Sequence, residues 1–231
     1  CGGIQLKTKG PLRHVSNCHC YQCMKTHGNY AAYTNTPEKD IKFIREKLES
    51  SVRPMFFFDD DADGLCSFLL LYRLVKDGKG VIIKTSPELS DRYVENVRNY
   101  SPDLIFILDK PQVSQDFLDE VTVPVIWIDH HQPVKRHKVH YFNPRINDDK
   151  DNRPTTYWAY QVVDQDMWIG TIGCIADWHF LPFFKEFSKN PQKIDLVFPP
   201  HASRRLAVLL LDGIRRAVGI MVQRRVITTG P

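Results

Sequence analysis

The sequence lacks the features that mark a membrane-spanning or secreted protein. None of its apolar runs approaches the ~20 residues that cross a bilayer, and the chain does not open with the basic and apolar regions of a secretory signal. We therefore expect a cytoplasmic protein with no membrane partner. Hydrophobic residues make up 42% of the 231 residues and charged residues 25%, as in an ordinary globular protein. This length allows one sizeable domain with appendages.

Lysine and glutamate are absent from residues 201–231, which carry six arginines and one aspartate. The net charge of the whole chain is +4, so the remainder is close to neutral. The apolar stretch 206–222 predicts a helix in this basic tail. The shift in basic residues near Pro199 predicts a boundary, and we expect three segments, at 1–36, 37–198 and 199–231. Because the first residue is Cys1 and not methionine, the sequence leaves open a fragment or a fusion.

Cysteine is concentrated in one short cluster, Cys18, Cys20 and Cys23. Three thiolates at this spacing can bind one Zn²⁺, although the sequence shows no fourth ligand. With Cys1-Gly2-Gly3-Ile4 before it, the segment resembles the opening half of the glutathione-dependent formaldehyde-activating family, whose later Cys-x-x-Cys-Gly is absent. The resemblance implies a zinc-binding module of the carbon-sulfur lyase type, and a remnant that does not bind zinc is the alternative.

Acidic residues stand at the ends of apolar strands. The predicted strand Phe56-Phe57-Phe58 runs directly into four carboxylates within five positions. Two later apolar strands end in Asp109 and in Asp129-His130-His131. The carboxyl ends of parallel strands meet at one edge of a sheet, so these groups are expected to form one site. So many carboxylates repel one another unless cations lie among them.

Strands and helices alternate through the middle of the chain, which predicts the α/β class. We expect a parallel sheet of four to five strands covered by helices on both faces, with a small Cys-rich segment before it and a helical basic tail after it. The predicted strands are 54–58, 81–85, 104–108, 123–128 and an edge strand at 139–142. The predicted helices are 37–48, 64–74, 88–99, 115–120, 155–165 and 167–177. Cys66 and Cys174 lie among apolar residues and are expected to pack in the core.

The chemistry of the predicted ligands favours hard metal ions. Carboxylate oxygens with one imidazole suit Mn²⁺ or Mg²⁺. Two such ions ~4 Å apart lower the pKa of a bridging water and stabilise the leaving oxygen of a displacement at phosphorus. The implied reaction is hydrolysis of a phosphoester or a phosphoanhydride.

Four motifs resemble those of DHH phosphoesterases, in the same order: Asp61-Ala62-Asp63-Gly64, Leu108-Asp109, Asp129-His130-His131 and the segment from Gly170 to Asp177. This superfamily includes RecJ-type single-strand exonucleases, oligoribonucleases, cyclic-dinucleotide phosphodiesterases and manganese pyrophosphatases. The resemblance implies two Mn²⁺ or Mg²⁺ ions, one held by Asp61 and the other by Asp63. Asp109 would bridge the two ions, and His130 and Asp177 would complete the ligand set.

The resemblance also assigns roles to the residues beside the ligands. Asp129 would orient its neighbouring imidazole, and His131 would face the scissile phosphate. Many relatives have a histidine at the positions that Phe57 and Asp59 occupy here, and Asp59 is expected to substitute as an oxygen ligand.

We find no glycine-rich substrate-binding module, so phosphate recognition is expected to rest on Lys110, Arg145 and the tail arginines. The expected substrate is a nucleotide or a single-stranded nucleic acid. A catalytically incomplete nucleotide-binding domain is the alternative, and the sequence determines neither the particular substrate nor the oligomeric state.

Overall fold

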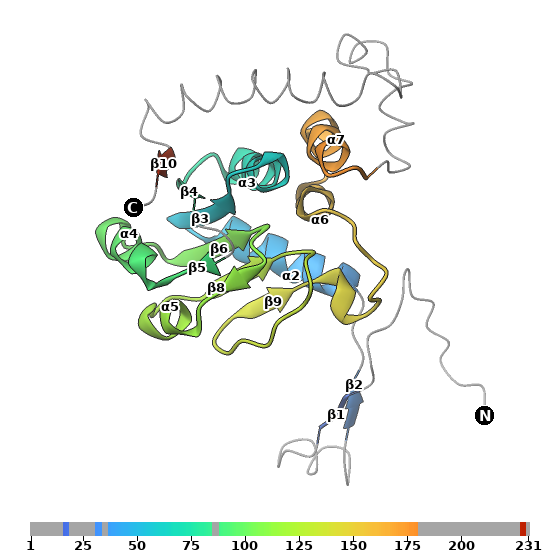
Figure 1. The fold of residues 1–231 in the computed structure, drawn as a ribbon, viewed down its shortest axis with the longest axis horizontal. Coiled ribbons are helices and arrows are strands. Elements are labelled where there is room, and N and C mark those ends of the chain that lie inside the picture. The colour runs from blue at the N-terminus through green and yellow to red at the C-terminus, as the bar shows by residue number, and fades with distance from the viewer. Residues whose placement is uncertain (1–15, 19–30, 34–36, 85–87, 180–226, 230–231) are drawn as a thin grey trace, which may run out of the picture.

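A six-stranded parallel sheet forms the centre of the molecule (Figure 1), in the order β10-β4-β3-β6-β8-β9. The computed structural model describes residues 16–18, 31–33, 37–84, 88–179 and 227–229. The strands are β3 (Pro54–Asp59), β4 (Lys79–Ile83), β6 (Leu104–Leu108), β8 (Val125–Ile128), β9 (His140–Phe142) and β10 (Ile227–Thr229). The predicted parallel sheet is therefore confirmed, and β10 adds one strand to it.

Helices cover both faces of the sheet because successive side chains of each strand point to opposite faces. In β3, Phe56 and Phe58 pack on one face, and Met55 and Phe57 pack on the other. The first face is covered by α2 (Pro37–Ser50), α3 (Ala62–Val75), α6 (Thr155–Val163) and α7 (Met167–Ala176). The second is covered by α4 (Val94–Tyr100) and α5 (Gln115–Glu120). Strands buried on both faces explain the unbroken apolar runs in the sequence.

The segment predicted as a helix at 88–99 differs at its start. Glu88–Leu89 is a short strand, β5, which pairs in parallel with β7 (Gln112–Val113). A 3₁₀ turn, η1 (Asp91–Tyr93), then leads into α4. The prediction was wrong there because β5 depends on a partner more than twenty residues away, which helical periodicity does not reveal.

The terminal segments are described only in part. β1 (Ser16–Cys18) and β2 (Ala31–Tyr33) form an antiparallel pair. The helix expected at 206–222 lies outside the described residues. The tail was expected to be helical, but its described residues, 227–229, form β10. Within the described ranges, no helix is both long and apolar enough to cross a bilayer.

Two glycines allow the close approaches that shape the site. A Cβ atom at Gly64 would lie 2.7 Å from the main chain of Asp59, so glycine lets α3 begin directly after β3. A Cβ atom at Gly173 would lie 2.3 Å from the Thr156 hydroxyl, so glycine lets α7 pack closely on α6. This close packing brings the end of α7 towards the carboxyl edge of the sheet.

The strand order places a topological switch point at that edge. β3 has β4 on one side and β6 on the other, so the chain leaves β3 in both directions along the sheet. In open α/β sheets, ligands bind beside the carboxyl ends of the strands at such a switch point. The acidic motifs follow β3 and β6, the two strands that flank it.

Candidate metal centre

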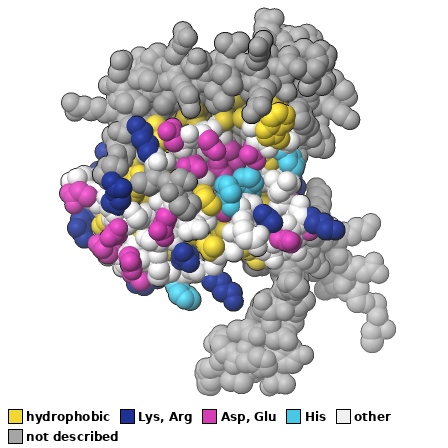
Figure 2. Space-filling view, viewed as in Figure 1, with side chains coloured by type: hydrophobic (Ala, Val, Ile, Leu, Met, Phe, Trp, Pro, Cys, Tyr) yellow, Lys and Arg dark blue, Asp and Glu magenta, His cyan; other side chains and the backbone are white. Residues whose placement is uncertain are grey.

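Three carboxylates from three different elements converge on one imidazole. Asp63 lies in the first turn of α3, Asp109 follows β6, and Asp177 follows α7. The Nε2 atom of His130 lies 3.6 Å from Asp63 Oδ2, 3.4 Å from Asp109 Oδ1 and 3.7 Å from Asp177 Oδ2. In Figure 2, acidic and histidine side chains gather on one face of the molecule. The ligand atoms of Asp63, His130 and Asp177 are close enough together to hold a metal ion.

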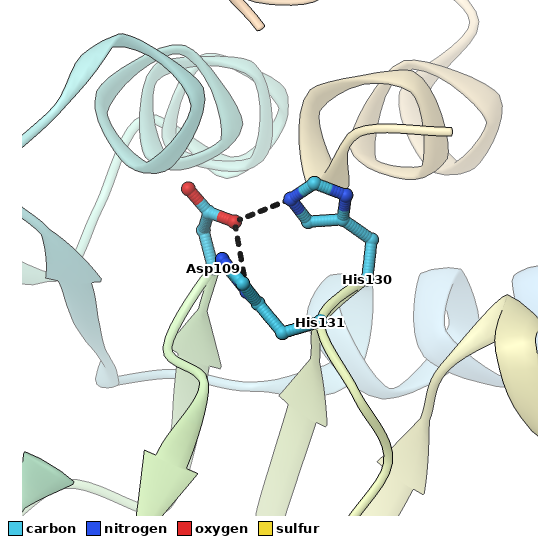
Figure 3. Close-up of side chains that lie close together, drawn as sticks. All are labelled: Asp109, His130 and His131. Carbon is cyan, nitrogen blue, oxygen red and sulfur yellow. Dashed lines mark ion pairs between the residues drawn. The ribbon is translucent and has the colours of Figure 1, made fainter. Parts of the chain in front are cut away.

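A second group of possible ligands shares His130 with the first. Figure 3 shows the rings of His130 and His131 directed towards the same carboxylate. Asp109, His130 and His131 offer ligand atoms that lie within 4.8 Å of one another. Asp109 has a positive φ of 59°, which turns the chain sharply at the end of β6. This turn directs its carboxylate towards His130, the residue that the two groups share.

The N-terminus of α6 holds two of these carboxylates in place. The N–H groups of Thr155 and Thr156 donate to Asp63 Oδ2 and Oδ1 at 2.8 and 2.6 Å. The Thr155 hydroxyl donates to Asp109 Oδ1 at 3.1 Å. A helix N-terminus offers unpaired N–H groups and a favourable dipole to an anion. Sequence reasoning missed this contact, although Pro154-Thr155-Thr156 is recognisable as a helix start.

Burial is the main cause of raised carboxyl pKa values in the centre. It raises the pKa of Asp63, which the charge of His130 and hydrogen bonds from Thr156 partly offset. Burial and the negative charges of Asp63 and Asp61 raise the pKa of Asp109 well above its usual range. The pKa of Asp177 is raised by burial and by the charge of Asp63. Burial and mutual repulsion thus disfavour the charged carboxylates, and divalent cations would offset this penalty.

Asp129 orients His131, which is the second of the two neighbouring imidazoles. Asp129 is fully buried, and its Oδ1 accepts a hydrogen bond from His131 Nδ1 at 2.7 Å. Its Oδ2 accepts from the Tyr141 hydroxyl and from Asn143 Nδ2, each at 3.2 Å. The hydrogen bond from Asp129 raises the pKa of His131. Sequence reasoning missed Tyr141 and Asn143, whose contacts with Asp129 exist only in the folded chain.

The remaining acidic residues of the first motif have separate surroundings. Asp61 caps α3, with Oδ1 accepting from the Gly64 N–H at 2.9 Å, and burial raises its pKa. Asp59 Oδ1 forms an ion pair with Lys110 Nζ at 2.7 Å. The Lys110 side chain is only 1% exposed. Phosphate recognition by Lys110 stays a prediction, and in this structure its ammonium group pairs with Asp59.

The predicted cysteine sites fall into two groups. Cys20 and Cys23 lie outside the described residues, and only the backbone of Cys18 is described, so zinc binding stays a prediction. Cys66 and Cys174 are free, buried thiols, as expected of packing residues. Burial raises the pKa of both thiols, so they are unreactive at neutral pH.

Comparison with known protein families identifies the family of this chain. The DHH family N-terminal domain matches residues 55–171, which is half of the chain. The chain belongs to the DHH family. The matched region contains the first three of the motifs and the beginning of the fourth. The DHH assignment made from the motifs is thereby confirmed.

Three solved structures are similar to this DHH chain at low identity. RecJ from Thermus thermophilus in complex with Mn²⁺ is 20% identical with a TM-score of 0.49, over 62% of this chain and 24% of that one. An exonuclease RecJ bound to manganese is 19% identical with a TM-score of 0.49, over 62% and 43%. The DHH domain of a protein described as a member of a ribosomal protein family is 13% identical with a TM-score of 0.51, over 81% and 62%.

This chain therefore spans between about a quarter and three fifths of the length of those structures. The comparison with curated proteins finds no match. The family and its fold are shared, and the activity has to be argued from the site itself.

Proposed function

We propose that the chain is a two-metal phosphoesterase that hydrolyses a phosphodiester or a phosphoanhydride in a nucleotide or an oligonucleotide. Membership of the DHH family supports a metal-dependent hydrolase. The observation that carries the proposal is the position of His130 Nε2, within 3.7 Å of carboxylates from three separate elements. Mutually repelling carboxylates gathered around one imidazole are typical of functional sites.

The donor set fits Mn²⁺ or Mg²⁺ better than a thiol-seeking metal. Carboxylate oxygens and one imidazole surround the centre, and the neighbouring thiols, Cys66 and Cys174, are buried in the core. The proposed ligands are Asp61, Asp63, Asp109, His130 and Asp177. When bound, two such ions supply a water of lowered pKa and stabilise the leaving oxygen.

The residues of the chain contribute orientation and a proton. Asp129 accepts the Nδ1–H of His131 and so fixes the imidazole with its Nε2 atom available to a substrate. The side chain of His131 is 41% exposed, so a phosphate oxygen can reach it. Because its pKa is raised, more of this ring carries a proton at neutral pH. We assign His131 the role of stabilising or protonating the leaving oxygen, with Asp129 as its positioning residue.

The test is hydrolysis by the purified chain in Mn²⁺ and separately in Mg²⁺. Suitable substrates are bis-p-nitrophenyl phosphate, short single-stranded DNA and RNA, cyclic dinucleotides and pyrophosphate. We expect turnover of at least one of them, abolished by EDTA and by His130→Ala. Asp116→Asn removes an exposed carboxylate on α5, which covers the face of the sheet opposite α3, α6 and α7, and serves as the matched control.

Two results would contradict the proposal. One is the absence of turnover with every substrate. The other is turnover that His130→Ala and Asp63→Ala leave unchanged. Tight, metal-dependent nucleotide binding without turnover would instead identify a non-catalytic binding domain built on the same fold.

A further inference from the structure

Lys110 is a buried cation at the edge of the metal centre. It follows Asp109 directly, and its side chain is 1% exposed. Lysine is almost never buried to this extent without a partner, because removing an ammonium group from water is costly. Its Nζ atom contacts Asp59 Oδ1 at 2.7 Å. An ion pair therefore joins the residue at the end of β3, before the first motif, to the residue that follows the second motif.

The surrounding structure fixes the backbone of this lysine. The carbonyl oxygen of Lys110 accepts a hydrogen bond from Trp127 Nε1 at 2.9 Å, and the Trp127 side chain is completely buried. The preceding residue, Asp109, has a positive φ. The turn after β6 thus sends the Asp109 carboxylate to the metal centre and the Lys110 ammonium to Asp59. Neither group depends on a mobile surface side chain.

The ion pair with Lys110 also affects the ability of Asp59 to bind a metal ion. Its Oδ1 atom accepts from both the Lys110 ammonium and the Asp60 N–H, the latter at 3.1 Å. With two donors on Oδ1, Asp59 has only its other oxygen, Oδ2, left to offer a metal ion. Asp59 also lies outside the groups of ligand atoms that converge on His130 and His131 among the described residues.

We propose that Lys110 is a built-in counter-ion that keeps Asp59 out of the metal-ligand set and lowers the negative charge of the centre by one. This inference rests on the proposed function, because it concerns the same metal ions. It makes Lys110 a positioning residue that sets metal affinity without touching metal or substrate. It also departs from the expectation that Asp59 serves as an oxygen ligand.

The test is a double-mutant cycle read by Mn²⁺ binding in calorimetry, independent of catalysis. Lys110→Met removes the positive charge and exposes the Asp59 carboxylate to the centre, so Mn²⁺ should bind roughly tenfold more tightly. Asp59→Asn leaves the ammonium uncompensated, so Mn²⁺ should bind roughly tenfold more weakly. The double variant removes both charges and should return to within about threefold of the parent.

Lys138→Met is the matched control. Lys138 forms a similar ion pair with Asp119 at 2.9 Å, but its side chain is 61% exposed. Its removal should leave Mn²⁺ affinity unchanged. Circular dichroism checks that each variant is folded. If Lys110→Met does not fold, comparison of Asp59→Asn with the charge-neutral double variant still decides the question.

Each outcome separates the possibilities. If Asp59 is a ligand, Asp59→Asn and the double variant both lose affinity, and the inference is overturned. If no variant changes Mn²⁺ affinity, the ion pair is purely structural, and the inference is also overturned. If the parent itself binds no Mn²⁺, the result contradicts the proposed function, and the inference about Lys110 is overturned as well.

Discussion

Asp63 and Asp177 are both proposed metal ligands, but the fold depends on them to different extents. Asp63 is buried, and its two oxygens accept the N–H groups of Thr155 and Thr156. Asp177 follows the last turn of α7, and its side chain is 38% exposed. Replacing each by alanine should abolish tight Mn²⁺ binding. Only Asp63→Ala should also destabilise the metal-free protein.

The size of this effect follows from the hydrogen bonds that are lost. A buried N–H group left without an acceptor costs about 1–3 kcal/mol, so two such groups cost roughly 2–6 kcal/mol. Removing one negative charge from beside Asp61 and Asp109 offsets part of this cost. We therefore expect Asp63→Ala to lower the free energy of unfolding by roughly 2–4 kcal/mol. Asp177→Ala should change it by less than about 1 kcal/mol, as expected of a partly exposed carboxylate.

Urea unfolding in EDTA, followed by circular dichroism, measures the two changes without the contribution of bound metal. Mn²⁺ titration of the same samples shows whether each variant has lost the metal. Equal stability of the two variants in EDTA would refute the argument that Asp63 anchors α6. Retention of parental Mn²⁺ affinity by Asp63→Ala would refute its assignment as a ligand.

Three other residues give independent predictions. Gly173→Ala should lower the free energy of unfolding by about 1–3 kcal/mol in urea melts, because the new Cβ atom would overlap the Thr156 hydroxyl; unchanged stability would contradict the packing described. Asp129→Asn should lower the pKa of His131 and move the alkaline limb of the pH–rate profile to lower pH; an unmoved limb would argue against His131 as the proton donor. Asp103→Asn should be less stable than the parent at neutral pH and equally stable in acid. Hydrogen bonds lower the pKa of Asp103 against the effect of burial, so the contribution of its carboxylate to stability disappears as the pH falls through that lowered value. Urea midpoints that differ equally at both pH values would contradict this prediction.

Much of the fold was predictable because its signals are local. Four apolar strands, the first three each followed by a helical pattern, predict a parallel sheet, and β3, β4, β6 and β8 all lie where expected or within a few residues of it. The order of the strands was not predictable, since it depends on which edges meet. β5 and β10 could not be predicted for the same reason. Each is only two or three residues long and exists because a partner strand lies beside it.

The candidate ligands were predictable because each one stands at the end of a strong element. Asp63, Asp109, His130 and Asp177 follow or begin such elements, and parallel topology brings those ends together. Their supporting residues could not be predicted in this way. Lys110 is the clearest example, because a lysine beside a proposed phosphate site suggests surface recognition. Its burial against Asp59 depends on the turn at Asp109 and on Trp127 of the next strand.

The contacts of Asp63 imply that the metal centre and the packing of α6 form together. Asp63 binds the first two N–H groups of α6, and Thr155 reaches from the same helix start to Asp109. Glycine at position 173 then seats α7 on α6, which carries Asp177 to the centre. A shift of α6 would therefore disturb ligands from α3, β6 and α7 at once. Rigid elements and hydrogen-bonded carboxylates hold such a site in place before any ion arrives, which is the arrangement that selective metal binding requires.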